Sequence, residues 1–122
     1  MTNAEQAMFA ALSGASAVTA LVGTRIYPVT IPAGKSLPAI TYFRVSGTPE
    51  RRLNNGGSSG QRVRVQVDCW ATTYAAAKSA AAAVQTAAIA AGFAFVQDRD
   101  LHEEDLNIFR VSMDFMGWQT PA

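Results

Sequence analysis

The chain contains one cysteine, Cys69, and one histidine, His102, the two side chains best suited to form a nucleophile and its base. Cys69 falls at an apolar position of an alternating segment and His102 falls in an acidic run, so we expect a buried thiol and an exposed imidazole. A nucleophile pair needs direct contact, and one cysteine with one histidine does not complete the usual structural zinc site. The pattern therefore predicts that Cys69 is a small buried apolar side chain.

A run of acidic side chains near residue 100 could supply the oxygen ligands that calcium prefers. The run lacks the ligand order and the glycine of an EF-hand loop, and both flanking segments have the composition of strands. We therefore favour the solvated tip of a hairpin, and we expect no metal, no cofactor and no enzyme activity. This acidic hairpin tip comprises Asp98, Asp100, Glu103, Glu104 and Asp105.

The segment from Gly47 to Gly60 reads GTPERRLNNGGSSG and predicts a long, flexible, polar loop. Its GGSSG end precedes a strand and lacks a following Lys-Ser/Thr, which argues against a phosphate-binding loop. Hairpin connections usually take about two to five residues, so this one is either functional or a tolerated insertion. We favour an assembly or docking arm that offers arginine donors and a leucine anchor. Its candidate residues are Arg51, Arg52, Leu53, Asn54 and Asn55.

Periodicity and turn residues predict the element order helix, helix, strand, strand, helix, strand, strand. The expected helices cover about 3–12, 17–22 and 73–91, and the expected strands cover about 39–46, 61–70, 93–101 and 107–118. The segment 25–37 is expected to be an extended crossing without a strand. Paired strands without regular helix alternation favour an α+β fold, a four-stranded, mainly antiparallel sheet covered on one face by helices. The 122 residues correspond to a single domain, 1–122.

Short signals predict where the helices begin and end. Thr2 and Glu5 have the spacing of a capping box, and Ser16 is positioned to cap the second helix. Gly23 and Gly92 follow the second and third helices, where a left-handed residue commonly ends a helix.

Alternation within 61–70 and 107–118 predicts strands with one buried and one wet face. The polar face comprises Arg62, Arg64, Gln66, Arg110, Ser112 and Asp114. One interpretation is a solvent-facing sheet. An alternative from a different functional class is a small ligand-binding or catalytic domain, in which the charged groups of this face and Asp68 converge on a small anion.

Composition limits the functional classes further. Charged residues make up 16% of the chain, against about 25% in typical soluble proteins. The net charge of +1 gives no global attraction for nucleic acid or anionic lipid, and a single cysteine excludes a disulfide framework. So few charges on a small protein favour a surface that is covered by another protein.

The charges are unevenly distributed along the chain. Residues 1–60 hold five cationic and two acidic side chains, whereas residues 61–122 hold five cationic and seven acidic ones. Unlike patches on one subunit suit a head-to-tail contact that closes a ring, although two solvated hairpin tips are an equal alternative on charge alone.

The apolar start of the chain raises the question of a signal peptide. Residues 1–23 lack the positive region that precedes a signal peptide's apolar stretch, and the apolar segment 80–92 is too short to span a bilayer. We therefore expect a protein made in the cytoplasm that does not enter a membrane.

The sequence resembles the small tail-completion, or tail-terminator, proteins of long-tailed bacteriophages. An N-terminal helix, an alanine-rich helix and the order of the elements carry the resemblance over nearly the whole chain. The matching segments are ALVGTRIYP at 20–28, PAITY at 38–42, VQVDCWA at 65–71 and RVSMDF at 110–115.

The resemblance implies a virion structural subunit of the tail or neck, assembled in the host cytoplasm. It implies a ring, expected to be a hexamer, that caps the tail tube protein and joins it to the head connector or stopper protein. The polar face could then line a hydrated lumen, where mixed charges let DNA pass without specific binding. Another head–tail neck or connector component is the alternative within the virion.

Overall fold

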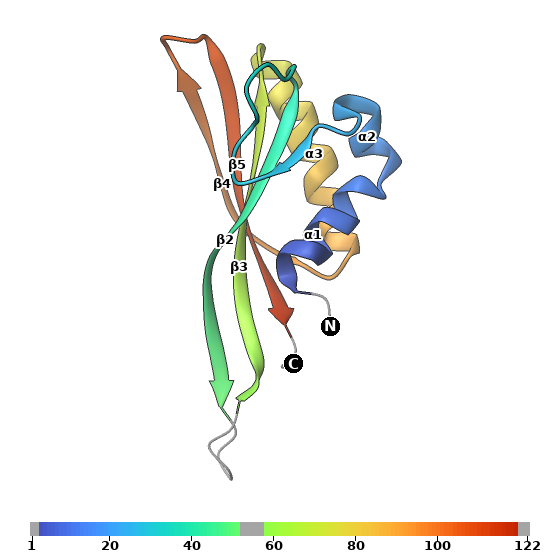
Figure 1. Ribbon diagram of the computed structural model, residues 1–122, viewed down its shortest axis with the longest axis vertical. Coiled ribbons are helices and arrows are strands. Elements are labelled where there is room, and N and C mark those ends of the chain that lie inside the picture. The colour runs from blue at the N-terminus through green and yellow to red at the C-terminus, as the bar shows by residue number, and fades with distance from the viewer. Residues whose placement is uncertain (1–2, 52–57, 120–122) are drawn as a thin grey trace.

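The computed structural model describes residues 3–51 and 58–119, and Figure 1 shows an elongated chain built on one sheet with helices on one side. The helices are α1 (Ala4–Ser13), α2 (Ser16–Val22) and α3 (Tyr74–Ala90). The strands are β1 (Ile26–Pro28), β2 (Ala39–Arg51), β3 (Ser58–Ala71), β4 (Ala94–Glu103) and β5 (Ile108–Gln119). The α+β class and the order of the long elements agree with the prediction.

The strand order is β1-β2-β3-β5-β4, so the predicted four-stranded sheet lacked one strand. β1 lies parallel to β2, with Ile26 opposite Ile40 and Pro28 opposite Tyr42, and the other described pairings are antiparallel. A three-residue strand contains too little alternation to recognise. The proline that ends it also made the segment 25–37 read as a crossing without a strand.

The β2–β3 hairpin is longer than predicted. β2 continues to Arg51 and β3 begins at Ser58, with Pro49 opposite Gln61. The prediction of a flexible loop over 47–60 is therefore wrong at 47–51 and 58–60. Glycine, proline and serine weaken strand propensity, but a proline is tolerated where a strand has an open outer edge, as β2 has here. The hairpin extends past the helices at the lower end of Figure 1.

Gly60 allows a close approach between β3 and β5 at the base of this hairpin. Its φ is 137°, and a Cβ atom built there would lie 2.5 Å from Cζ2 of Trp118. Within the described residues, β5 pairs with β3 as far as Gln119, which lies opposite Gln61. Within the described residues, only β2 and β3 continue beyond this pair.

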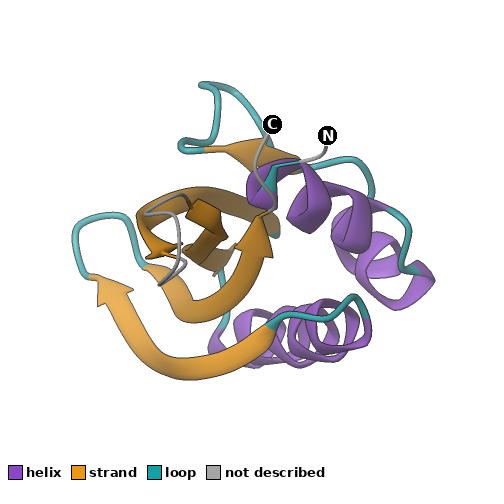
Figure 2. Cartoon of the chain, turned by 90° about the horizontal axis from the view of Figure 1, so that it is seen from below, coloured by secondary structure: helices purple, strands orange, loops and turns teal. Residues whose placement is uncertain are grey.

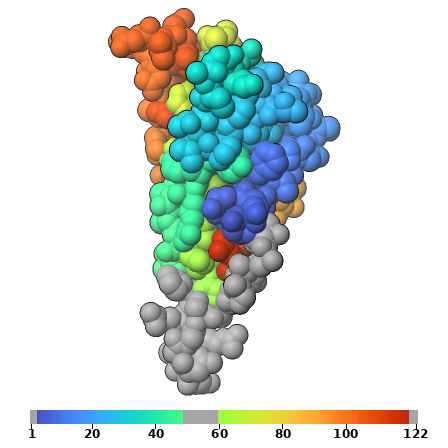
Figure 3. Space-filling view, viewed as in Figure 1, coloured from blue at the N-terminus to red at the C-terminus, as the bar shows by residue number. Residues whose placement is uncertain are grey.

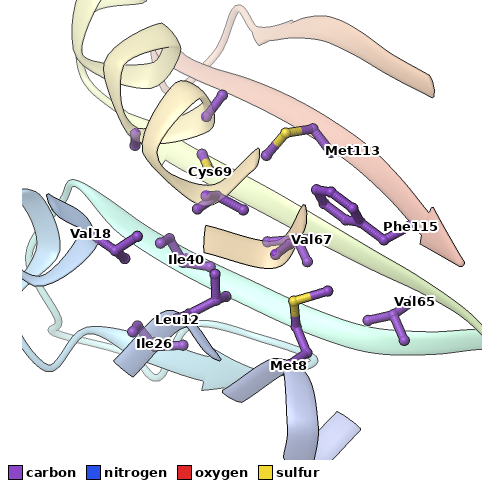
Figure 4. Packing of buried hydrophobic residues seen from close by; sticks show 14 of the residues in the cluster. Met8, Leu12, Val18, Ile26, Ile40, Val65, Val67, Cys69, Met113 and Phe115 are labelled. Atoms are coloured by element: carbon purple, nitrogen blue, oxygen red, sulfur yellow. The ribbon is translucent and has the colours of Figure 1, made fainter. Parts of the chain in front are cut away.

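The core lies between the helices and one face of the sheet. Figure 2 shows the helices gathered on one side of the curled sheet, and Figure 4 shows Met8 of α1 packed toward Val65 and Val67 of β3, with Leu12 beside Ile26 and Ile40. Full burial of such a side chain contributes about 1.5–3 kcal/mol. α3 adds mainly small side chains, which bury little area but let the helix lie close to the sheet. Its buried residues are Ala77, Ala80, Ala81, Val84 and Ala88.

The helix ends agree only partly with the prediction. Asn3, not Thr2, caps α1: its Oδ1 accepts from the backbone N–H of Gln6 at 2.7 Å, and Oε1 of Gln6 accepts from the backbone N–H of Asn3 at 3.0 Å. The N-cap of α2 is Ala15 and Ser16 is its first residue, so the predicted serine cap is wrong. The predicted capping box at α1 is therefore correct in type but was placed one residue too early. Glu5 does not have the capping role predicted for it.

Within the described residues, no single helix is long and apolar enough to cross a membrane, and α1 with α2 meets the length and composition criteria only as a pair bent by 79°. The buried side chains of this pair include Met8, Leu12, Val18 and Val22, which pack in the core.

Candidate functional site

The polar face of the sheet is partly covered. Thr41, Asp68, Ser112 and Asp114 are only 1–5% exposed, although they lie on the face opposite the core residues of β2, β3 and β5. The segment after β1 and the β4–β5 turn contribute to one cavity over this face. The expectation of a wet face is therefore wrong at Asp68, Ser112 and Asp114, because alternation along one strand does not reveal how the whole sheet curls.

Arg110 is at the centre of the charged contacts on this face. Its Nη1 lies 3.5 Å from Oδ2 of Asp68, and its Nη2 lies 3.5 Å from Oε1 of Glu103. The guanidinium carbon lies 4.7 Å from the ring centroid of Trp70, within cation–π range. Nε2 of Gln66 donates to Oδ1 of Asp68 at 3.0 Å. The buried Asp68 carboxylate is thus compensated by one cation and one amide.

Asp114 forms a second, separate charged contact on the same face. Its Oδ2 accepts from Nε2 of Gln97 at 3.0 Å and lies 3.9 Å from Nη1 of Arg64. Its Oδ1 and Oγ of Ser112 are buried without a hydrogen-bond partner within the described part of the chain. Each of the two buried carboxylates, Asp68 and Asp114, therefore lies close to one arginine. Much of the charge on the polar face is compensated by these pairs.

The cavity over this face has a volume of about 740 Å³. Its concave form matches the geometry that a ligand-binding domain requires. Arg62 and Arg64 do not line it, however, and Arg110 already contacts two carboxylates, so an anion entering the cavity would compete with Asp68 and Glu103. Side chains that line it include Ile31, Leu37, Phe43, Gln66, Asp68, Trp70, Leu106, Ile108 and Arg110.

The acidic hairpin tip is divided among separate contacts. Asp100 accepts a hydrogen bond from Oη of Tyr74 at 2.6 Å, and Nζ of Lys78 lies 3.4 Å from its other oxygen. The hydrogen bond between Tyr74 and Asp100 raises the pKa of Tyr74 and lowers the pKa of Asp100. Glu104 and Asp105 are exposed in the turn. Across residues 3–51 and 58–119, no three histidine, cysteine or acidic side chains gather in a way that could hold a metal ion.

Cys69 and His102 have separate surroundings. Cys69 is fully buried on the helix-covered face of β3, as predicted, and burial raises the pKa of its thiol. His102 is exposed; its ring stacks on Phe109 with centroids 4.5 Å apart, and its Nε2 lies 3.1 Å from Oδ1 of Asn107. No described hydrogen bond joins the two residues.

The two hairpin ends lie at opposite ends of the long axis. Figure 1 shows the β2–β3 hairpin at the lower end and the β4–β5 turn at the upper end. Of the predicted docking arm, Arg51 is the last residue of β2 and pairs with Ser58, while Arg52, Leu53, Asn54 and Asn55 lie outside the described residues.

A second cavity, of about 330 Å³, was missed by the sequence analysis and lies between α1 and β2 beside the end of β1. The rings of Phe9 and Tyr42 are 5.9 Å apart beside it, and Oε1 of Glu5 is buried without a described hydrogen-bond partner. Burial, together with the nearby Glu5 carboxylate, raises the pKa of Tyr42. One feature of the sequence could have indicated this cavity: Asn3 and Gln6 also have capping-box spacing, so Glu5 need not serve as a helix cap.

Comparison with known proteins relates the chain to one family model and to several solved structures. A family model described as "Tail completion protein gp17" matches residues 6–120. Among solved structures, the chain is similar to a chain of the virion of a native gene transfer agent particle. The TM-score is 0.75, and the identity is 22% over 97% of this chain and 95% of the other, a likeness that concerns the fold. No curated protein matches the chain.

Proposed function

Because the chain belongs to the tail completion protein gp17 family, and is thus a structural protein of the bacteriophage virion tail, we propose that it forms a ring of six copies that caps the tail tube and joins it to the head connector. The observation that carries this proposal is the separation of the two hairpin ends along the long axis (Figure 1). Subunits standing side by side in a ring would present the β2–β3 hairpin on one face of the ring and the β4–β5 turn on the other.

This arrangement changes the role of the two unlike patches. Charge alone suggested that the basic and acidic tips contact each other between neighbouring copies. In the proposed ring they face different partners, one the tube protein and the other the connector. The docking arm of Arg51 to Asn55 and the turn residues of the acidic hairpin tip, Glu104 and Asp105, then serve contacts along the tail axis.

The polar face supports a role in lining the lumen. Arg110 with Asp68, and Arg64 with Asp114, are already paired within the chain. Free arginines would bind DNA phosphates and slow its passage, whereas arginines that are paired with carboxylates present a surface of low net charge. DNA is therefore expected to pass this face without specific binding.

Light scattering at micromolar concentration, with and without the tube protein, tests the proposal. We expect a particle of about six times the 12.9 kDa chain mass in at least one condition. A strict monomer in both conditions would refute the ring. Binding to the connector but not to the tube protein would favour the alternative neck or connector component.

The 740 Å³ cavity favours one second candidate, a small-ligand domain. Titration of the Trp118→Phe variant with inorganic phosphate, followed by the indole fluorescence of the remaining Trp70, distinguishes the two functions. Saturable binding that is lost in Arg110→Gln would support the ligand-binding function, and an unchanged spectrum up to millimolar phosphate would remove it.

A further inference from the structure

Two strand edges of the sheet are open within the described residues. β1 pairs only with Ile40–Tyr42, so β2 has an unpaired outer edge from Phe43 onward. β4 forms the opposite edge and pairs only with β5. Unpaired edges of this length are templates for strand addition.

The 330 Å³ cavity lies where β1 stops and the outer edge of β2 becomes open. We call it the edge slot. The backbone N–H of Val29 donates to the carbonyl of Tyr42 at 2.9 Å, and β2 continues past this bond without β1. One wall of the slot is formed by Glu5 and Phe9 of α1, and its floor by Tyr42, Phe43 and Arg44 of β2 (Figure 3, α1 in dark blue beside β2 in green). An added strand would therefore continue the line of β1 and cover these side chains.

The charges near the two edges are complementary. Arg44 of β2 pairs with the buried Val65, which places Arg44 on the helix-covered face of the sheet. On β4, Asp98 pairs with Met113 and Asp100 pairs with Val111, both core residues, so these carboxylates lie on the same face. A sheet continued from β4 of one copy to β2 of another would put Asp98 on the side where Arg44 lies, while Asp100 stays with Tyr74 and Lys78 of its own copy.

The strand directions also suit this pairing. β2, β3, β5 and β4 alternate in direction, so β4 runs opposite to β2. Rotation about an axis along the strands preserves direction, so β4 of one copy meets β2 of the next in antiparallel orientation. β2 has a bulge at Val45 and β4 has a bulge at Val96. These bulges, together with the charged side chains of β4, discourage pairing with strand edges of other shape or charge.

We propose that β4 of one copy adds to the open outer edge of β2 in the next copy and fills the edge slot. This inference rests on the proposed ring, for which it supplies the contact between subunits. The contact is heterologous and repeats around the ring, so each copy uses one edge on each side.

Cross-linking of two coproduced single variants tests the contact. One variant carries Val45→Cys and the other carries Val96→Cys, and one of the two also has a size tag. The mixture is treated with a bismaleimide of about 10 Å reach. This reach tolerates an error of about three residues in the register between the two strands. Val45 and Val96 are 47% and 41% exposed, and the native Cys69 is fully buried, so the reagent reaches only the introduced thiols. Val45→Cys with Ile89→Cys is the matched control, because Ile89 is 49% exposed on α3.

The proposal predicts a 45–96 link at least tenfold stronger than the 45–89 link, with no 45–45 or 96–96 product. Light scattering on the same samples separates the two hypotheses. A ring whose 45–96 link does not exceed the control overturns the edge contact and leaves the ring intact. A monomer at every concentration, with and without the tube protein, overturns both.

Discussion

Replacing Arg110 with alanine should destabilise the fold by about 2–3 kcal/mol. Removing one partner of a fully buried ion pair costs about 3–5 kcal/mol, because the remaining charge is left uncompensated. The Asp68 side chain is 4% exposed but that of Arg110 is 24% exposed, and Gln66 would still donate to Asp68, so the cost should fall below that range. At this chain length 1 kcal/mol corresponds to about 3–5 °C, so the thermal midpoint should drop by roughly 6–15 °C.

Thermal unfolding followed by circular dichroism measures this effect, and Lys78→Gln provides the control. The Lys78–Asp100 pair has nearly the same separation, 3.4 Å against 3.5 Å, but both of its side chains are more than 40% exposed, so its loss should leave the midpoint unchanged. The double variant Arg110→Met with Asp68→Leu should recover most of the loss, because apolar side chains replace both charges. Equal midpoint shifts in Arg110→Ala and Lys78→Gln would refute the argument from burial.

Three further predictions concern the docking arm, the thiol and the acidic tip. Arg51→Glu with Arg52→Glu should weaken tube binding at least tenfold while leaving the thermal midpoint within about 2 °C; unchanged tube binding and infectivity would remove the arm from the proposal. Cys69 should react with a thiol reagent only after denaturant is added, and stoichiometric labelling of the native protein would contradict its burial. Tyr74→Phe should raise the pKa of Asp100 toward its ordinary value, because the hydrogen-bond donor that lowers this pKa is lost. An NMR pH titration of the Asp100 carboxyl carbon measures the change, and an unchanged pKa in the variant would contradict the hydrogen bond.

The sequence predicted the elements whose pattern is local. Alternation of valines with arginine, glutamine and aspartate identified most of β3, and Gly92 closely marked the end of α3. β1 was missed because its pairing with β2 depends on a contact 14 residues away rather than on its own three residues. The extension of β2 and β3 was missed because its glycines, proline and serines resemble a loop, while the neighbouring strand supplies the hydrogen bonds.

The candidate sites depend still more on tertiary structure. The polar residues of β3 and β5 were found on one face, but the burial of Asp114 depends on neighbouring strands, whose Gln97 and Arg64 contact it. The edge slot could not be predicted, because it combines α1, the end of β1 and the open edge of β2. Glu5 in particular had been assigned to a helix cap that Asn3 and Gln6 form instead.

The narrowing of the sheet beyond Gln61 and Gln119 has a mechanical consequence. Above this level β5 supports the hairpin, and Trp118 packed on Gly60 fixes its base. Below it, only β2 and β3 continue within the described residues, and a two-stranded ribbon twists more readily than a wider sheet. We therefore expect the described strands to bend more easily beyond Gly60. In the proposed ring, such bending would let the end of the hairpin adjust to a mismatch in diameter or rotation with an adjoining partner, while the body of each subunit keeps its shape.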